Sequence, residues 1–280
     1  MILIDLNQVM ISNMMAQLGG KGSDISEDLV RHMILNSIRG YNVKFKEEFG
    51  DIIICCDSRH YWRREVFPNY KSQRKQAREE SSHDWDKIFT IFNQVRDELK
   101  EQMPYRVVDV YGAEADDIIA VLVKNHPDEK ILILSGDKDF IQLQKYSNVK
   151  QYAPIQKKWI EGVDPKQYIK EHILKGDRGD SIPNFLSADD TFVNGIRQKP
   201  ISKKKLSYWI ASDPKGFCNE YQYRNFQRNM RLVDFDYIPK EVEDNIMTEF
   251  KSEQFVGRHN ILNYFIKNKL KDLIGQIQEF

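Results

Sequence analysis

Four short, continuous apolar runs alternate with longer amphipathic segments in the first half of the chain. The runs cover residues 2–4, 52–56, 105–108 and 131–134, and helix-length segments lie at 26–49, 85–102 and 115–124. Uninterrupted apolar runs of this length are typical of strands that are buried on both faces of a parallel sheet. The alternation therefore predicts an α/β fold with a mostly parallel central sheet flanked by helices.

The pattern changes after about residue 160. Asp164-Pro165 is a suitable start for a helix that runs to about residue 174, because proline is accepted in the first helical turn. A turn-rich connector follows at residues 175–183, and the remaining residues form helical pieces in polar loops. We therefore predict an α/β core at residues 1–160 and a mainly helical region at 161–280. The amphipathic stretch at 257–280 favours core packing, with a partner-binding tail as the alternative.

Nine acidic residues follow the apolar runs or lie in turns. They are Asp5, Asp57, Glu114, Asp116, Asp117, Asp137, Asp139, Asp177 and Asp180. Ligands of open parallel sheets bind beyond the carboxyl ends of the strands, so these side chains are expected to converge there. Crowded carboxylates repel one another unless a cation neutralises them, and oxygen ligands suit Mg²⁺. The sequence predicts a metal site, against the alternative of an acidic rim that steers cations. Asp117 can also be a residue that starts a helix.

A basic segment follows the second apolar run. Residues 59–78 contain seven lysines and arginines against one acid, Glu65, with aromatic residues interleaved. Cations bind phosphates, and aromatic rings stack on exposed bases. The alternative is a solvated loop, but a cationic segment beside a metal site is what a phosphodiester substrate needs. A second basic run, at residues 197–205, is compatible with duplex contact or with a solvated face.

Composition narrows the possible classes of protein. Lys plus Arg and Asp plus Glu both number 42, so the formal net charge is zero and only local charge can select a polyanion. Three cysteines give no disulfide framework, and neither a membrane-spanning run nor a signal peptide is recognised, so a cytoplasmic protein is expected. The six histidines have no metal-ligand spacing, and no nucleophile elbow or phosphate-binding glycine-rich loop is present.

Three acidic motifs and one basic motif resemble those of the 5′-nuclease (flap endonuclease) superfamily. The acidic motifs lie at residues 114–117, 136–139 and 176–183, and the basic one is Tyr70-Lys71-Ser-Gln-Arg74 with Arg63 upstream. Within the superfamily, the chain is most similar to the 5′–3′ exonucleases of the T-even bacteriophage ribonuclease H type. The resemblance implies a PIN-like nuclease core, a basic arch at about 59–82 and a helix-hairpin-helix-type duplex-binding motif after residue 161. Ser181 departs from the family pattern, which has asparagine there.

The resemblance also implies roles for single residues. One Mg²⁺ is expected at Asp5, Asp57, Glu114, Asp116 and Asp137, and a second at Asp139, Asp177 and Asp180, with Asp117 as a further family acid. Mn²⁺ can substitute for Mg²⁺. Lys71 and Arg74 are the expected catalytic contacts to the scissile phosphate. The expected nucleic-acid-binding residues are Arg59, Arg63, Arg64, Tyr70, Lys71, Arg74, Lys75, Arg78 and Arg178.

The function that follows is a Mg²⁺-dependent 5′–3′ exonuclease with ribonuclease H and flap endonuclease activity, which removes RNA primers and adjacent DNA during lagging-strand replication. Expected partners are RNA–DNA and DNA duplexes with a 5′ end or flap, a sliding clamp and a single-strand DNA-binding protein. A monomer in the host bacterial cytoplasm is expected. The alternatives are a catalytically weak branched-DNA-binding protein, a toxin-like PIN endoribonuclease and a small-molecule phosphatase. The basic segment argues against the last two, and the full acid set argues against the first.

Overall fold

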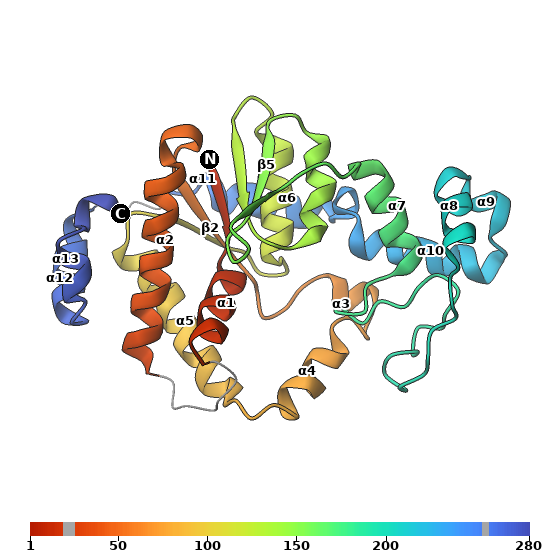
Figure 1. Ribbon diagram of the computed structural model, residues 1–280, viewed down its shortest axis with the longest axis horizontal. Helices are drawn as coiled ribbons and strands as arrows, with labels where there is room; N and C mark the ends of the chain where they lie inside the picture. The colour runs from red at the N-terminus through yellow and green to blue at the C-terminus, as the bar shows by residue number, and fades with distance from the viewer. Residues whose placement is uncertain (19–25, 254–257) are drawn as a thin grey trace.

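A six-stranded sheet forms the centre of the protein, whose computed structural model describes residues 1–18, 26–253 and 258–280 (Figure 1). The strands are β1 (Ile2–Asp5), β2 (Ile52–Cys56), β3 (Arg106–Asp109), β4 (Ile131–Leu134), β5 (Val149–Ala153) and β6 (Lys158–Ile160). Their order is β3-β2-β1-β4-β5-β6, and only β6 is antiparallel to its neighbour. The predicted mostly parallel sheet is confirmed. Strands β5 and β6 were not predicted, because polar residues interrupt both.

The order of the strands reverses at β1. Ile4 is paired with Ile54 of β2 on one side and with Leu134 of β4 on the other. The connections between strands therefore run in opposite directions on the two sides of β1. This opens a crevice beyond the carboxyl edge of the sheet. Asp5 ends β1 at this point, so the first residue of the predicted acidic set lies at the reversal.

Helices cover both faces of the sheet. One face packs against α1 (Leu6–Leu18), α2 (Glu27–Phe49), α5 (Trp85–Gln102), α12 (Ile261–Lys267) and α13 (Lys271–Ile274). The other packs against α6 (Ala115–Asn125), α11 (Lys240–Lys251) and the 3-10 helices η1 (Lys138–Lys145) and η2 (Phe235–Tyr237). Ile2 and Ile4 face the first layer and Leu3 the second, as the alternation of a strand requires. Apolar residues on both faces explain why the runs are continuous.

Two short helices lie in the segment between β2 and α5. They are α3 (Arg63–Val66) and α4 (Ser72–Glu79), and the chain then crosses to the N-terminus of α5 (Figure 1). We call residues 59–82 the arch. Its root packs in an apolar cluster where Phe67 meets Ile173 of α7 (Pro165–Lys175) and Leu232 of α10 (Glu220–Val233).

The connector after α7 turns sharply at Gly176. This residue has φ +65°, and a Cβ there would lie 2.3 Å from the carbonyl oxygen of Ile182, so only glycine fits. The next helix is α8 (Lys203–Ala211), followed by α9 (Pro214–Phe217). Leu174 of α7 and Leu206 of α8 share one apolar cluster, so the two helices pack together across a long connection.

The C-terminal residues return to the sheet. Within the predicted 257–280 stretch, Gly257 lies outside the described residues, and the remainder forms η3 (Arg258–Asn260), α12, α13 and η4 (Ile277–Glu279). Ile261, Phe265 and Leu270 are buried in the core, whereas Leu262 is exposed. Core packing is therefore the observed role of most of this stretch. The domain boundary near residue 160 stays a prediction. No helix in the described part of the chain has the length and apolar character to cross a membrane.

Candidate metal-dependent active site

Asp5 and Asp57 lie side by side at the carboxyl edge of the sheet because they end neighbouring parallel strands. Asp5 Oδ1 accepts a hydrogen bond from the backbone N–H of Gln8 at 3.0 Å. Asp57 accepts two hydrogen bonds of 2.7 Å, from the Ala115 backbone to Oδ1 and from Asn7 Nδ2 to Oδ2. Each carboxylate is thus oriented by the start of a helix that follows a strand.

The acids at the start of α6 point in two directions. Glu114 and Asp116 line the same cleft as Asp5. Asp117 is fully buried elsewhere: its Oδ2 accepts hydrogen bonds from the Glu114 backbone at 3.0 Å and from Trp62 Nε1 at 3.2 Å, and its Oδ1 lies 2.8 Å from Arg63 Nη2. Its contacts form a capping box and a buried ion pair. The structure therefore gives Asp117 the role of a residue that starts a helix.

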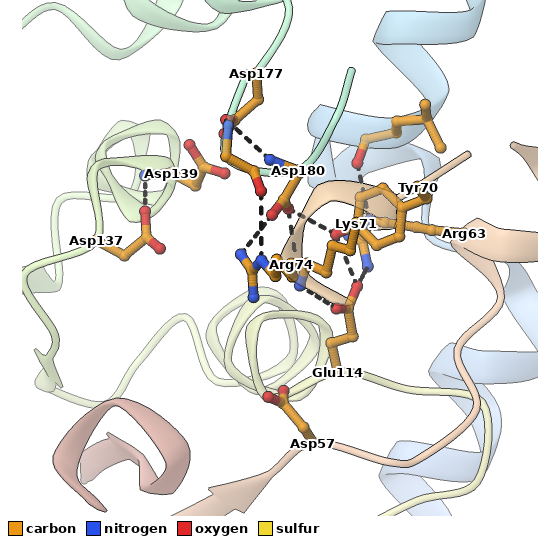
Figure 2. Close-up of polar contacts among 12 residues, drawn as sticks. Asp57, Arg63, Tyr70, Lys71, Arg74, Glu114, Asp137, Asp139, Asp177 and Asp180 are labelled. Carbon is orange, nitrogen blue, oxygen red and sulfur yellow. Dashed lines mark hydrogen bonds and ion pairs between the residues drawn. The ribbon is translucent and has the colours of Figure 1, made fainter. Parts of the chain in front are cut away.

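The turn after β4 separates Asp137 from Asp139. Asp137 Oδ1 accepts a hydrogen bond from the Asp139 backbone at 2.9 Å, which caps η1, and the side chain lines the cleft (Figure 2). Asp139 instead approaches α7 and the connector, where it lies near Asp177. The two carboxylates of one short motif therefore lie in two neighbouring groups of side chains.

Five of the nine predicted acids share one cleft of about 950 Å³, which we call the acidic cleft. They are Asp5, Asp57, Glu114, Asp116 and Asp137. They come from β1, β2, α6 and the turn after β4, so the reversal of strand order gathers them. Of the remaining acids, Asp139 and Asp177 lie together beside α7, Asp180 accepts a hydrogen bond from Tyr70 of the arch, and Asp117 is buried on α6 against Arg63.

Crowding shows in the acid–base properties of the acidic cleft. Burial, reinforced by the charge of Asp57, raises the pKa of Asp5 to about 7. Burial and the charges of Asp137 and Asp5 raise the pKa of Asp116 well above its usual range. Outside the cleft, burial and the charges of the neighbouring Asp137 and Asp177 do the same for Asp139. These carboxyl groups hold protons because no positive charge neutralises them. Carboxylate oxygens are the ligands that hard divalent cations favour, so the residues fit a metal.

Lys71 and Arg74 already neutralise two acids. The Lys71 ammonium pairs with Glu114 and lies 3.7 Å from Asp180 Oδ2, while Arg74 pairs with Asp180 Oδ1 (Figure 2). Burial alone would raise the pKa of both carboxyls, but Lys71 with Arg63 lowers that of Glu114, and Lys71 with Arg74 lowers that of Asp180. These two acids are therefore charged, unlike the crowded ones.

The predicted nucleic-acid-binding residues fall into three groups. Arg59, Arg64, Lys71, Arg74 and Arg78 line the acidic cleft. Arg63 and Tyr70 are buried: Arg63 binds Glu114, Asp117 and the Leu232 carbonyl, and the Tyr70 hydroxyl donates to Glu114 and Asp180. Lys75 and Arg178 are exposed outside the described lining of this cleft. The first group therefore lies on the wall of the acidic cleft, where Lys71 is buried and both Lys71 and Arg74 are already paired with acids.

His172 is the residue that sequence reasoning missed. Its imidazole Nε2 lies 3.3 Å from Asp139 Oδ1 and 3.7 Å from Asp177 Oδ2. The histidines show no metal-ligand spacing along the chain, but here three side chains come together from η1, α7 and the connector. A histidine five residues before Asp177, on the last turns of a helix, is the only signal in the sequence.

Comparison with known proteins assigns the family. A family model for the N-terminal resolvase-like domain of 5′–3′ exonucleases matches residues 8–173, and a model for the C-terminal region of T4 RNase H matches residues 164–280. The chain belongs to the 5′–3′ exonuclease family. It is therefore a 5′–3′ nuclease, which confirms the predicted superfamily, fold and class of enzyme.

Relatives of this nuclease support the assignment along its whole length. It is 41% identical to the ribonuclease H of Enterobacteria phage T4, across 99% of this chain and 95% of that protein. It is 31% identical to a 5′–3′ exonuclease of Buchnera aphidicola, across 50% and 49% of the two chains. Among solved structures, the bacteriophage T5 flap endonuclease in a complex with DNA and metal ions matches with a TM-score of 0.62 at 16% identity, across 89% of this nuclease and 97% of that chain. The last similarity shows the fold.

Proposed function

We propose that this nuclease uses two Mg²⁺ ions to hydrolyse RNA–DNA and DNA duplexes from a 5′ end or flap, and so removes RNA primers and adjacent DNA during lagging-strand replication. The observation that carries the proposal is the meeting of five carboxylates with the basic arch in one cleft. The ribonuclease H of phage T4 and the T5 flap endonuclease solved with DNA and metal ions support it.

The acidic cleft would hold one ion and the Asp139–Asp177 pair the other, with Asp180 beside them. When bound, such ions activate water at neutral pH and stabilise charge on the phosphate and the leaving oxygen; Mn²⁺ can replace Mg²⁺. The protein's part is to fix the donors. Asp57 is held by two hydrogen bonds and Asp137 by the turn that it caps, so neither has to reorganise when an ion enters.

Lys71 and Arg74 would bind the non-bridging oxygens of the scissile phosphate. Both face the cleft while paired with Glu114 and Asp180, so an arriving phosphate can take over part of each ion pair. Cations placed where negative charge develops stabilise the transition state. Lys71 is held in a left-handed backbone conformation, φ 56°, with its N–H donating to the Asp180 carbonyl at 2.8 Å. That conformation aims its side chain at Glu114.

Binding of the strand would be the task of the remaining cationic residues. Arg59, Arg64 and Arg78 line the cleft at the arch and would bind the 5′ strand, while the basic start of α8 at Lys203 would contact duplex phosphates. Contacts to phosphates carry no sequence information, so cleavage should follow the shape of the substrate. A sliding clamp and a single-strand DNA-binding protein are proposed partners of a monomer that acts in the host bacterial cytoplasm.

The test is cleavage of 5′-labelled RNA-primed and flapped duplexes with Mg²⁺. Asp116→Asn should slow cleavage about a thousandfold, which corresponds to roughly 4 kcal/mol of transition-state stabilisation. Asp244→Asn is the matched control, because Asp244 is exposed on α11 and pairs with Lys240. Wild-type protein that binds flapped DNA in Mg²⁺ without cutting it would instead indicate a branched-DNA-binding protein.

A further inference from the structure

His172 lies between Asp139 and Asp177, two acids outside the acidic cleft. One ligand atom each of Asp139, His172 and Asp177 lies within 4.8 Å of the others. The Nε2 atom of His172 is buried and makes no hydrogen bond, although carboxylate oxygens lie 3.3 and 3.7 Å away. A buried nitrogen that faces two carboxylates without a hydrogen bond to either is an unsatisfied polar group. A ligand that binds all three groups would satisfy it.

Neighbouring groups fix the orientation of all three side chains. The ring of His172 stacks on Tyr168, one helical turn earlier on α7, with centroids 5.7 Å apart and planes 12° from parallel. The Tyr168 hydroxyl also reaches Asp139 Oδ1 at 3.4 Å. Asp177 Oδ1 accepts hydrogen bonds from the backbone of Gly179 and Asp180, which leaves Oδ2 as the atom nearer the imidazole. The donors are therefore held in place before any ligand arrives.

We propose that His172 Nε2 is a metal ligand, which together with Asp139 and Asp177 forms an outer site, outside the acidic cleft, with a mixed nitrogen and oxygen donor set. The inference rests on the proposed function, in which these two acids hold the second ion. A nitrogen donor shifts the preference of a site from Mg²⁺ toward transition metals, since imidazole suits borderline ions and Mg²⁺ prefers oxygen. The outer site should thus bind Co²⁺ or Mn²⁺ more tightly than Mg²⁺, while the acidic cleft keeps an oxygen-only set.

The competing arrangement is a charged histidine that merely pairs with Asp139 and Asp177. It would bring no nitrogen to the ion, because only the neutral ring has a lone pair for a metal.

The experiment uses the full chain with Co²⁺ as the probe. Hyperfine-shifted imidazole N–H signals in the proton NMR spectrum report nitrogen coordination, and calorimetric titration gives the affinities for Co²⁺ and for Mg²⁺. His172→Gln should abolish the shifted signals and weaken the outer Co²⁺ site by at least about tenfold, with a smaller effect on Mg²⁺. His259→Gln, at an exposed histidine of the C-terminal helices, is the matched control and should retain both.

A second variant separates coordination from folding. His172→Asp restores a donor without nitrogen, so it should recover Mg²⁺ binding but not the imidazole signals or the preference for Co²⁺. Absence of shifted imidazole signals in the wild type, or their persistence in His172→Gln, would overturn the assignment. Neither result depends on turnover, so a wild-type protein that shows the signals but cuts no nucleic acid would refute the proposed function and leave this assignment standing.

Discussion

The hydroxyl of Tyr70 lies 2.9 Å from Asp180 Oδ2 and 3.1 Å from Glu114 Oε2, and so connects the arch to two acids that come from different halves of the chain. The phenol ring is buried and has an edge-to-face contact with Tyr61 at 5.6 Å. Arch, α6 and connector are therefore one hydrogen-bonded unit.

Tyr70→Phe should lower the free energy of unfolding by about 2 kcal/mol, because hydrogen bonds to charged groups are worth more than neutral ones. Urea unfolding in EDTA measures this without interference from metal. Tyr111→Phe is the control, since Tyr111 is 78% exposed, and should change stability by less than about 0.5 kcal/mol. Equal losses in the two variants would show that the bridge contributes nothing.

Adjacent acids of α6 should respond in opposite ways to the same change. Asp117→Asn removes one charge from the buried pair with Arg63 and should destabilise the metal-free protein by about 2 kcal/mol. Asp116→Asn relieves the crowding that raises the pKa of Asp116, so it should raise the melting temperature in EDTA while it slows cleavage about a thousandfold. Calorimetry of both variants decides the matter; a stabilised Asp117→Asn would contradict its assignment as a structural residue.

The stability of the metal-free protein should fall as the pH rises through neutrality. The folded-state pKa of Asp5 is about 7 against an ordinary 3.8, so the folded chain holds a proton that the unfolded chain has lost. That contribution is complete below the unfolded pKa and disappears as the pH rises through the folded one. Between about pH 5 and about pH 8, the melting temperature of the wild type should drop more steeply than that of Asp5→Asn. Parallel curves would refute the shift.

Arginines that line the acidic cleft should matter more for binding than exposed basic residues beside them. Arg78→Ala should weaken binding of a flapped duplex and reduce the slope of log affinity against log salt by about one, as expected for one lost phosphate contact. Lys75→Ala, from the same helix, is the control, because Lys75 is exposed and pairs with Glu79. Fluorescence anisotropy in Ca²⁺ over a salt series gives both quantities. Identical slopes for the two variants would place the strand elsewhere.

The sequence predicts best those strands and helices whose pattern lies in consecutive residues. The runs at 52–56 and 131–134 are strands with those bounds, because burial on both faces leaves only apolar residues. The first helix, Leu6–Leu18, was not predicted, although Asp5 precedes it and accepts a hydrogen bond from the Gln8 backbone in its first turn. Strand β5 escaped prediction because Lys150 and Gln151 break its pattern.

Site residues whose role depends on distant partners were the hardest to predict. Asp116 and Asp117 are equivalent in the sequence, and the partners Arg63 and Trp62, which arrive from the arch, distinguish the buried Asp117. His172 becomes a neighbour of Asp139 only through the packing of α7 on η1. The local sequence pattern predicts which types of residue lie at the sheet edge. Which of their atoms face one another depends on tertiary contacts.

Arg63 also has a consequence for how this nuclease can vary in evolution. Its guanidinium binds Glu114, Asp117 and the Leu232 carbonyl, each within 2.9 Å, at the root of the arch. The far end of the segment is fixed separately, where Asp84 caps α5. Insertions and deletions before Lys71 would pull this anchor away from the acids, whereas changes of length at residues 80–83 would leave it in place. Homologous nucleases should therefore differ in arch length mainly on the α5 side, and substrate range can change there without loss of the chemistry.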